Sequence, residues 1–488
     1  MLFRAPLFVL LLGAVAFPAR TTPASGSQAA RDGAPVHLTA AEDRDRLMHL
    51  LGLSQLRPPQ SGDAKSPNSC NYDEARANPY HNLPDPLQFD NGSRVTTAKG
   101  WFSRRRPEIM ALYDREVLGR TPPNLPKVTW KVVAESPARL GGVNVMIQHV
   151  VGHVDNSIDT AITVDIQLLL AVPAHARGRV PVVMELEFPE DFDAAMARPL
   201  SAAFTGPWAH YSVDPIPALQ HGWAFAMLKP TSIQADDGAG LTHGIIGLMN
   251  HGQPRSLEDW GALKAWAWGA SRCLDYFATD PALDARHVAL EGHSRYGKAV
   301  LVAMAYDPRF AIAYSSSSGE GGAKLYRHIY GEPIPNLAST TEYHWMAGNF
   351  LKYDGTLNAG DLPVDNHELI ALAAPRPIFI GSGSNNGDGY ANPNGDGWAD
   401  PRGMFLAEVA ATPVYRLLGV QGLETSTFPP VETALVKGHL AFRQHSDGHT
   451  PKPNWPAFLD FASRYLQGPG APASAVQDGS AKARHGSA

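Results

Sequence analysis

The chain has 488 residues, of which 44% are apolar and 18% are charged, and its formal net charge is −6 at pH 7. This length and composition allow a large buried core, in one big domain or two ordinary ones. The slightly acidic balance argues against nucleic acid or an anionic membrane as the main partner, because no basic run is longer than Arg104–Arg106.

The first residues have the pattern of a secretion signal. Arg4 supplies a positive charge, the apolar stretch 7–17 follows it, and small residues lead up to Ala19. A helix that spans a membrane needs about 20 apolar residues, so this stretch is too short to be an anchor. We therefore predict a signal peptide, a secreted or periplasmic mature protein, and no membrane association once the signal is removed.

Small and polar residues mark the parts of the chain outside the folded domain, because such segments bury too little apolar surface to fold. Within the N-terminal part, Thr39 and Glu42 have the spacing of a capping box and predict a short helix over 38–53, with a linker at 57–69. The predicted divisions are a signal peptide at 1–19, an N-terminal extension at 20–69, a single α/β domain at 70–468 and a disordered tail at 469–488.

A strand-rich region follows a predicted helix at 101–123, and strands then alternate with helices. Alternating or continuous apolar runs identify these elements. The predicted strands are 127–136, 143–154, 158–172, 180–188, 222–230, 286–292, 310–318 and 375–383, and the predicted helices among them are 259–280 and 295–307. Repeated β–α alternation predicts an α/β fold with a mostly parallel central sheet and helices on both faces, a three-layer sandwich.

The stretch "GHSRYG" connects one predicted strand to the helix after it and has the form of a nucleophile elbow. A turn this sharp pushes the hydroxyl of Ser294 out over the C-terminal edge of the sheet. Gly292 and Gly297 remove side chains that would collide there, although Tyr296 stands where the commoner motif has its second glycine. The N–H groups that begin the next helix favour negative charge near the serine. We predict that Ser294 is a nucleophile.

The motif "GHSRYGKA" resembles the nucleophile motif of the glucuronoyl esterases, carbohydrate esterase family 15. The resemblance continues in order through most of the chain, in the blocks "NPYHNLPDPLQFDNG", "SGEGGAKLYRHIYGE", "YHWMAGNFLKY", "DNHELIALAAPRPIFI", "DGWADPRGMF" and "NWPAFLDFA". It implies an α/β-hydrolase fold and an esterase that cleaves esters of (4-O-methyl-)D-glucuronic acid, such as lignin–glucuronoxylan cross-links. It further implies plant cell-wall carbohydrate as the partner and no cofactor; we expect a monomer.

The catalytic base must lie late in the chain, because this fold orders its triad as serine, acid and histidine. The C-terminal region "HLAFRQHSDGHTPKPNWPAFLDF" offers His439, His445 and His449. The resemblance selects His449, since the family places its histidine shortly before a tryptophan-containing segment, here Trp455. His445 is the alternative.

The acid should follow the strand at 375–383, where the loop contains Asp388, Asp396 and Asp400. Bacterial relatives commonly read D-x-W-x-D-P at this point, which selects Asp396 as the residue that orients the histidine and leaves Asp400 as the alternative. Loops rich in Gly, Asn and Asp can also bind calcium, but the D-x-D-x-D spacing of an EF-hand is absent. We expect no metal.

Many relatives, especially fungal ones, carry the acid earlier, in an E-S-G-x-G-G pattern. The corresponding stretch here is "SSGEGG", so Ser317 occupies the acid position. Glu320 lies within the glycine turn, and a chain reversal there is expected to point it elsewhere. The departure from the family pattern makes the later aspartate necessary.

The resemblance also implies roles for residues around the pocket. Arg295 would stabilise the oxyanion through its backbone N–H and guanidinium, and one such donor typically lowers the barrier by about 3–4 kcal/mol; a structural ion pair with a neighbouring carboxylate is the alternative. Lys298 and Glu342 would contact sugar hydroxyls. Trp345 and Trp398 would wall the pocket, or else pack in the core.

Two further functions remain open from the sequence. Another secreted serine hydrolase on the same fold, an acetyl xylan esterase or a peptidase, would carry the same elbow and triad. A carbohydrate-binding protein that has lost catalysis would keep the pocket alone. The two cysteines, Cys70 and Cys273, cannot form a CxxC redox or zinc site. Export permits a disulfide between them, and buried free thiols are equally compatible.

Overall fold

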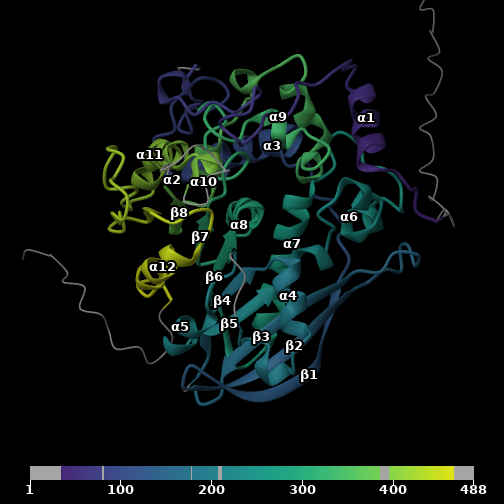
Figure 1. Ribbon diagram of the computed structural model, residues 1–488, viewed down its shortest axis with the longest axis vertical. Helices are drawn as coiled ribbons and strands as arrows, with labels where there is room; N and C mark the ends of the chain where they lie inside the picture. The colour runs from purple at the N-terminus through teal and green to yellow at the C-terminus, as the bar shows by residue number, and fades with distance from the viewer. Residues whose placement is uncertain (1–33, 80–81, 177, 207–210, 385–394, 467–488) are drawn as a thin grey trace, which may run out of the picture. The chain divides into compact units, whose positions relative to one another are not determined.

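A nine-stranded sheet runs through the computed structural model of the chain (Figure 1). The structure describes residues 34–79, 82–176, 178–206, 211–384 and 395–466, all within one structural unit, 33–488. The predicted signal peptide, the C-terminal tail and Asp388 lie outside the described residues. The strands are β1 Val128–Leu140, β2 Val143–Val154, β3 Asp165–Pro173, β4 Val180–Leu186, β5 Ala224–Leu228, β6 Leu283–His293, β7 Ile312–Ser316, β8 Ile378–Gly383 and β9 Leu440–His445.

The strand order is β1-β2-β3-β5-β4-β6-β7-β8-β9. Strands β1, β2, β3 and β5 pair antiparallel, and the pairs from β5 through β4 to β9 are all parallel. Strand β5 lies between β3 and β4 in the sheet although it follows β4 in the chain. Helical segments of the chain connect β4 to β5 and β5 to β6. The predicted α/β-hydrolase fold is therefore confirmed.

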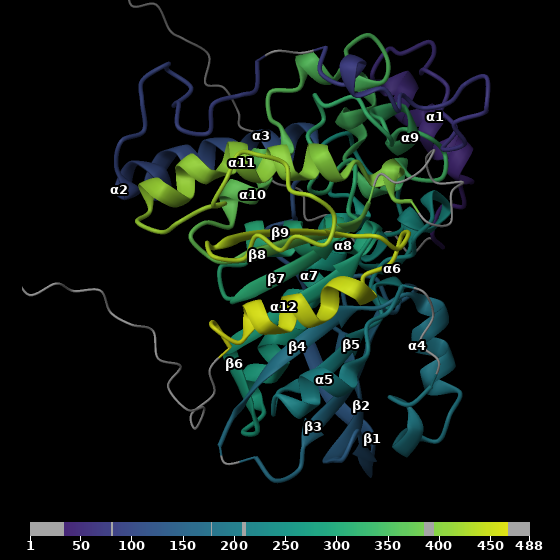
Figure 2. The same ribbon diagram turned by 60° about the vertical axis from the view of Figure 1, so that its left-hand side comes forward.

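Helices cover both faces of the sheet. Figure 2 shows α12 on one side of β8 and β9 and α10 and α11 on the other. The helices are α1 Ala40–Leu50, α2 Ala98–Gly100, α3 Arg106–Glu116, α4 Pro189–Met196, α5 Pro215–Gln220, α6 Gly244–Met249, α7 Ala262–Thr279, α8 Arg295–Tyr306, α9 Ile334–Leu337, α10 Asn366–Leu372, α11 Pro401–Leu417 and α12 Trp455–Ala462.

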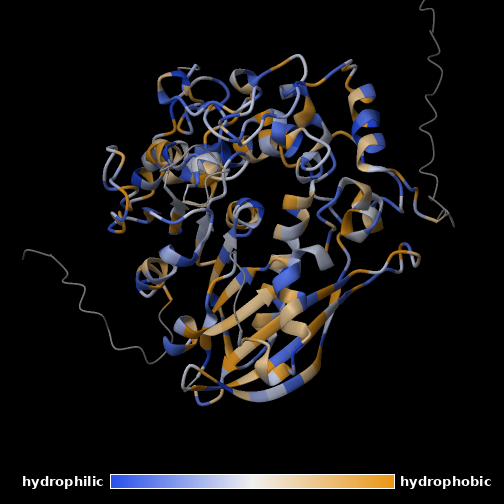
Figure 3. Cartoon of the chain, viewed as in Figure 1, coloured by the Kyte–Doolittle hydropathy of each residue, from blue (hydrophilic) through white to orange (hydrophobic). Residues whose placement is uncertain are grey.

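The core has two parts because side chains alternate across each strand. Leu168 and Leu170 of β3 join the cluster beneath α7, α8, α10 and α11, whereas Leu169 joins the cluster beneath α5 and α12. Figure 3 shows the central strands coloured mainly as hydrophobic, as expected for strands buried on both faces, whereas edge strand β1 is largely exposed.

The described part of the N-terminal extension packs on this body. Helix α1 begins at the Thr39–Glu42 capping box that the sequence predicts. Leu47 is fully buried, and the Tyr343 hydroxyl donates to Asp43 at 3.1 Å. Segment 34–69 thus contributes to the same fold as the residues after it.

The cysteines are two buried free thiols. Burial raises the pKa of the Cys70 thiol to about 12, so this group is un-ionised at neutral pH. Among the described residues, none of the helices combines the length and the apolar character that crossing a membrane requires.

Candidate active site

The elbow is formed where β6 ends at His293 and α8 begins at Arg295. Ser294 between them has φ 55° and ψ −123°, a conformation that few residues other than glycine adopt, and its N–H donates to the Ser316 carbonyl at 2.8 Å. A Cβ atom on Gly292 would lie 2.5 Å from the Tyr296 carbonyl oxygen. A Cβ on Gly297 would lie 2.9 Å from the Gly292 carbonyl oxygen. The turn therefore requires both glycines.

The elbow opens on a cavity of about 260 Å³. Residues far apart in the sequence meet there, because the C-terminal ends of β6, β7 and β8 lie side by side at one edge of the sheet. The predicted residues that line the cavity are Ser294, Arg295, Lys298, Ser317, Glu342, Trp345, Trp398 and His449. The predicted nucleophile and the predicted base thus share one cavity.

His449 is held from behind by Asp396. A distance of 2.7 Å separates His449 Nδ1 from Asp396 Oδ1. The second carboxylate oxygen, Oδ2, accepts from the Ser317 hydroxyl at 2.5 Å and from the Gly383 N–H at 2.9 Å. Burial alone would raise the pKa of Asp396, but His449 and these hydrogen bonds outweigh it and lower the pKa. A buried, ionised carboxylate is what a histidine needs to keep its orientation and to carry a proton.

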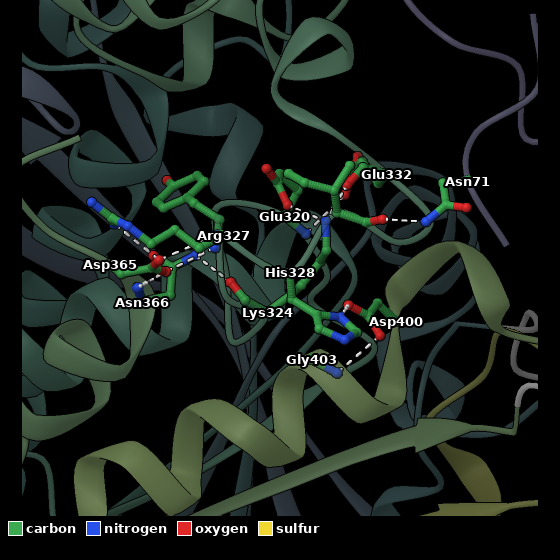
Figure 4. Close-up of polar contacts among 12 residues, drawn as sticks. Asn71, Glu320, Lys324, Arg327, His328, Glu332, Asp365, Asn366, Asp400 and Gly403 are labelled. Carbon is green, nitrogen blue, oxygen red and sulfur yellow. Dashed lines mark hydrogen bonds and ion pairs between the residues drawn. The ribbon is translucent and has the colours of Figure 1, made fainter. Parts of the chain in front are cut away.

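The alternative acids have other partners. Asp400 Oδ2 lies 2.6 Å from His328 Nδ1, and its Oδ1 accepts from the Gly403 N–H at 2.9 Å, which caps α11 (Figure 4). Glu320 forms a buried ion pair with Lys324 in the same view. The structure therefore brings Asp396, and neither of these two residues, to His449 Nδ1.

The alternative histidines also have partners away from the cavity. His445 Nε2 lies 2.9 Å from the Thr450 carbonyl oxygen, inside the turn that carries His449. His439 Nδ1 lies 2.6 Å from the Pro375 carbonyl oxygen, at the other end of β9. Neither lines the cavity around Ser294.

Two rings pack against the His449 imidazole. The His293 ring lies 4.3 Å from it, centroid to centroid, and Tyr211 stacks on His293 at 5.3 Å and meets His449 edge-on at 5.8 Å. His293 is anchored by Ser316 on the neighbouring strand, since its Nδ1 lies 3.0 Å from the Ser316 hydroxyl. The sheet therefore fixes one wall of the His449 site.

Arg295 follows the nucleophile and pairs with a carboxylate. Its guanidinium forms an ion pair with Asp236, the kind of contact that a structural arginine would make, and also lies 5.5 Å from the Trp345 ring. Its backbone N–H belongs to the first turn of α8, where it has no partner within the helix. Arg295 thus places both a positive charge and the N-terminal end of α8 at the cavity.

Lys298 lines the cavity, but its ammonium protons already have acceptors. Nζ donates to the carbonyl oxygens of Ser318 at 2.9 Å and Glu320 at 2.7 Å, and to Glu332 Oε2 at 3.1 Å. Because an ammonium has three protons, these contacts use its donor capacity. Lys298 therefore brings charge to the cavity, and a sugar hydroxyl would have to displace one of these partners to bind it.

Glu342 lines the same cavity with an unusual carboxyl group. Burial and the nearby Glu332 raise its pKa to about 8, against the opposing effect of Lys298 and Arg295. Its Oε2 has no hydrogen-bond partner among the described residues. At neutral pH the group is protonated and able both to donate and to accept a hydrogen bond.

Comparisons with known proteins agree with this geometry. The family model described as "Glucuronyl esterase, fungi" matches residues 253–419. The chain is 30% identical over 449 residues to carbohydrate esterase MZ0003 of an unknown prokaryotic organism, covering 86% of this chain and 98% of that protein. The structure resembles a CE15 glucuronoyl esterase from Teredinibacter turnerae T7901, with a TM-score of 0.79 and 40% identity over 87% of this chain and 99% of that one. The chain belongs to carbohydrate esterase family 15.

Other relatives of this family 15 protein agree. A glucuronoyl esterase from Solibacter usitatus has a TM-score of 0.69 and 33% identity, over 81% of this chain and all of that one. The 4-O-methyl-glucuronoyl methylesterase of Schizophyllum commune is 30% identical over 349 residues, covering 69% of this chain and 74% of that protein. The protein is a carboxylic ester hydrolase of the glucuronoyl esterase type.

Several residues of the esterase site were not predicted from the sequence. Gly62 of the N-terminal extension and Glu332 line the cavity, and Asp236 and His293 contact residues that do. Asp236 and Gly62 come from loops with no motif to mark them. His293 stands beside the nucleophile in the motif itself, and Glu332 ends the quoted block "SGEGGAKLYRHIYGE"; these positions are the signals that the sequence carries for the four residues.

Proposed function

We propose that this glucuronoyl esterase hydrolyses esters of (4-O-methyl-)D-glucuronic acid, including those that join glucuronoxylan to lignin, with Ser294, His449 and Asp396 as its triad. The observation that carries the proposal is the 2.7 Å contact between His449 and the buried Asp396 at the rim of the cavity into which Ser294 opens. Without the buried carboxylate, the imidazole would lack the fixed tautomer that base catalysis needs.

The reaction proceeds in two acyl-transfer steps. His449 takes the hydroxyl proton of Ser294 as the serine oxygen attacks the C6 carbonyl of the uronate. Arg295 and the first N–H groups of α8 stabilise the tetrahedral anion. His449 then protonates the departing alcohol, and water, activated by the same imidazole, hydrolyses the glucuronoyl-enzyme to free the acid and the serine.

The lining of the cavity suits a uronate ring. Glu342 and Lys298 supply polar groups for ring hydroxyls, and Trp345 and Trp398 supply flat apolar surfaces for the sugar faces. The curated relatives named 4-O-methyl-glucuronoyl methylesterase make a methylated glucuronate the first substrate to test. We further propose that residues 1–19 direct secretion and that the mature monomer acts on plant cell-wall carbohydrate, without metal or cofactor.

The test compares benzyl D-glucuronate with p-nitrophenyl acetate for the wild type and for Ser294→Ala. We expect a kcat/KM at least tenfold higher on the glucuronate ester and near-complete loss of hydrolysis in the variant. A clear preference for the acetate would instead support an acetyl xylan esterase. Failure of a fluorophosphonate probe to label the wild type would support a binding protein that has lost catalysis.

A further inference from the structure

Asp236 contacts three side chains, one of which is the arginine of the elbow. It lies in the loop between β5 and α6, just before the short 3₁₀ helix Gly238–Thr242. Its Oδ1 accepts from His344 Nε2 at 2.9 Å and from Trp345 Nε1 at 2.6 Å, and its Oδ2 accepts from Arg295 Nη1. One carboxylate thus links the residue after the nucleophile to the segment that walls the cavity.

The protonation states of His344 and Asp236 follow from their surroundings. Burial lowers the pKa of His344, so its ring is neutral at neutral pH, and the 2.9 Å contact with Asp236 assigns its proton to Nε2. Burial alone would raise the pKa of Asp236, but the bonds from His344, Arg295 and Trp345 outweigh it and hold the pKa far below its usual range. Asp236 is therefore ionised at neutral pH and accepts hydrogen bonds from all three side chains.

The guanidinium of Arg295 is confined by this carboxylate and by aromatic rings. It lies 5.5 Å from the Trp345 ring and 5.9 Å from the Phe188 ring. The Arg295 side chain is 39% exposed, so without a protein partner it could adopt several rotamers. The Asp236 contact removes that freedom on the side facing Trp345.

We propose that Asp236 is a positioning residue for the oxyanion site: it fixes the Arg295 guanidinium against Trp345 before substrate arrives. This inference rests on the proposed function, in which Arg295 stabilises the tetrahedral anion. Donors that are ordered in advance stabilise developing charge without reorganisation during the reaction, and the benefit is expressed in the transition state more than in the bound ester. Loss of Asp236 should therefore lower kcat and leave KM nearly unchanged.

The test is a double-mutant cycle with Asp236→Asn and Arg295→Ala, assayed on benzyl D-glucuronate. In Asp236→Asn the amide oxygen still accepts from His344 and Trp345, while its NH₂ group faces the guanidinium donors, so only the Arg295 contact is lost. We expect Asp236→Asn to lower kcat about tenfold, with KM changed by less than about twofold. In the Arg295→Ala background the same substitution should change kcat by less than about twofold.

The control is Asp237→Asn, the exposed neighbour whose carboxylate caps the next turn through the Ala239 N–H at 2.9 Å. It should leave kcat and KM unchanged. If Asp236→Asn does not fold, as judged by circular dichroism, Asp236→Glu replaces it. This variant keeps the charge but moves the carboxylate by one methylene, so a fall in kcat that disappears in the Arg295→Ala background would report the position of the carboxylate.

The possible outcomes distinguish failure of the positioning role of Asp236 from failure of the proposed esterase function. An equal fall in kcat in both backgrounds, a fall in KM alone, or a rise in kcat on removal of Asp236 would overturn the positioning role while leaving the esterase intact. A wild type that does not hydrolyse the glucuronate ester would instead overturn the proposed function. The double-mutant cycle would then have no kcat from which a coupling between Asp236 and Arg295 could be measured.

Discussion

At the level of single residues, Asp396 and Asp400 occupy one loop but belong to different networks. Asp396 contacts His449, whereas Asp400 contacts His328 and caps α11. We expect Asp396→Ala to lower kcat roughly 10³- to 10⁴-fold, since the base loses its orienting carboxylate. Asp400→Ala should change kcat only mildly and lower the free energy of unfolding by about 3–5 kcal/mol, because it removes the buried partner of His328 as well as the cap.

These two variants are compared by initial rates on benzyl D-glucuronate and by urea unfolding. If Asp400→Ala reduces kcat more than Asp396→Ala does, the acid is assigned to the wrong aspartate. Asp396→Asn, which keeps the size of the side chain, serves as the matched variant in case truncation disturbs the loop.

The Glu342 carboxyl predicts an alkaline limit to activity. Its pKa is raised to about 8 by burial and by Glu332, so it is neutral below that pH and becomes an anion in the cavity above it. We expect kcat/KM to fall with a midpoint near pH 8 as the group loses the proton it donates to a sugar hydroxyl. Glu342→Gln cannot ionise and should have a lower kcat/KM without this alkaline fall. A limb that persists unchanged in the variant would assign it to another group.

At the level of elements, the β–α alternation and the capping box were sufficient to predict most of the fold. Strand β9 was missed, because its six residues "LAFRQH" include three polar side chains and imitate a loop. Helices α4, α5 and α6 were missed as well, since they have eight residues or fewer and thus too few turns for an apolar period to be visible. Helix α11 was also missed, although it has 17 residues.

The site could be predicted only where a motif marks it. The elbow and the D-x-W-x-D-P loop identify Ser294 and Asp396 as candidates, and their catalytic roles stay predictions that mutation must test. Asp236 reaches Arg295 across 59 positions of sequence. Contacts of that span depend on how loops fold over the sheet edge, and a single sequence carries no local signal for them.

Gly292 in the turn from β6 to α8 can be tested by mutation. Gly292→Ala would place a Cβ 2.5 Å from the Tyr296 carbonyl oxygen, which belongs to the helix backbone and cannot move alone. We expect loss of nearly all activity and a free energy of unfolding lower by about 1–3 kcal/mol, from overpacking. Gly100→Ala is the control, since its new Cβ comes no nearer than 3.2 Å to another atom, Thr97 Oγ1. Wild-type activity in Gly292→Ala would mean that the elbow can open.

At the level of the whole molecule, three buried acids give the core a dependence on pH. Glu185 on β4 is the register partner of Glu291 on β6, and Glu187 follows β4. Burial raises the pKa of Glu187 to about 8, with Asp191 adding to it, and raises those of Glu185 and Glu291 well above the usual range. Glu187 is therefore protonated in the folded protein at neutral pH, and burial favours the protonated form of Glu185 and Glu291 as well.

The sign of the effect follows from proton binding. An unfolded glutamate loses its proton near pH 4.5, whereas folded Glu187 keeps its proton until about pH 8, and the pKa values of Glu185 and Glu291 are raised in the same direction. Between those values the folded state binds more protons than the unfolded state, so the free energy of unfolding falls as pH rises. One fully buried group of this kind contributes a slope of about 1.4 kcal/mol per pH unit.

We therefore expect Glu291→Gln to flatten the pH dependence of stability above about pH 5, the region in which an unfolded glutamate is ionised. The amide has the shape of the protonated acid and cannot ionise, so the variant should gain stability relative to the wild type as pH rises, by up to about 1.4 kcal/mol per pH unit. Urea unfolding at pH 5, 6, 7 and 8 measures this difference. Parallel curves for the two proteins would mean that Glu291 is already ionised in the folded protein and that burial does not raise its pKa as expected.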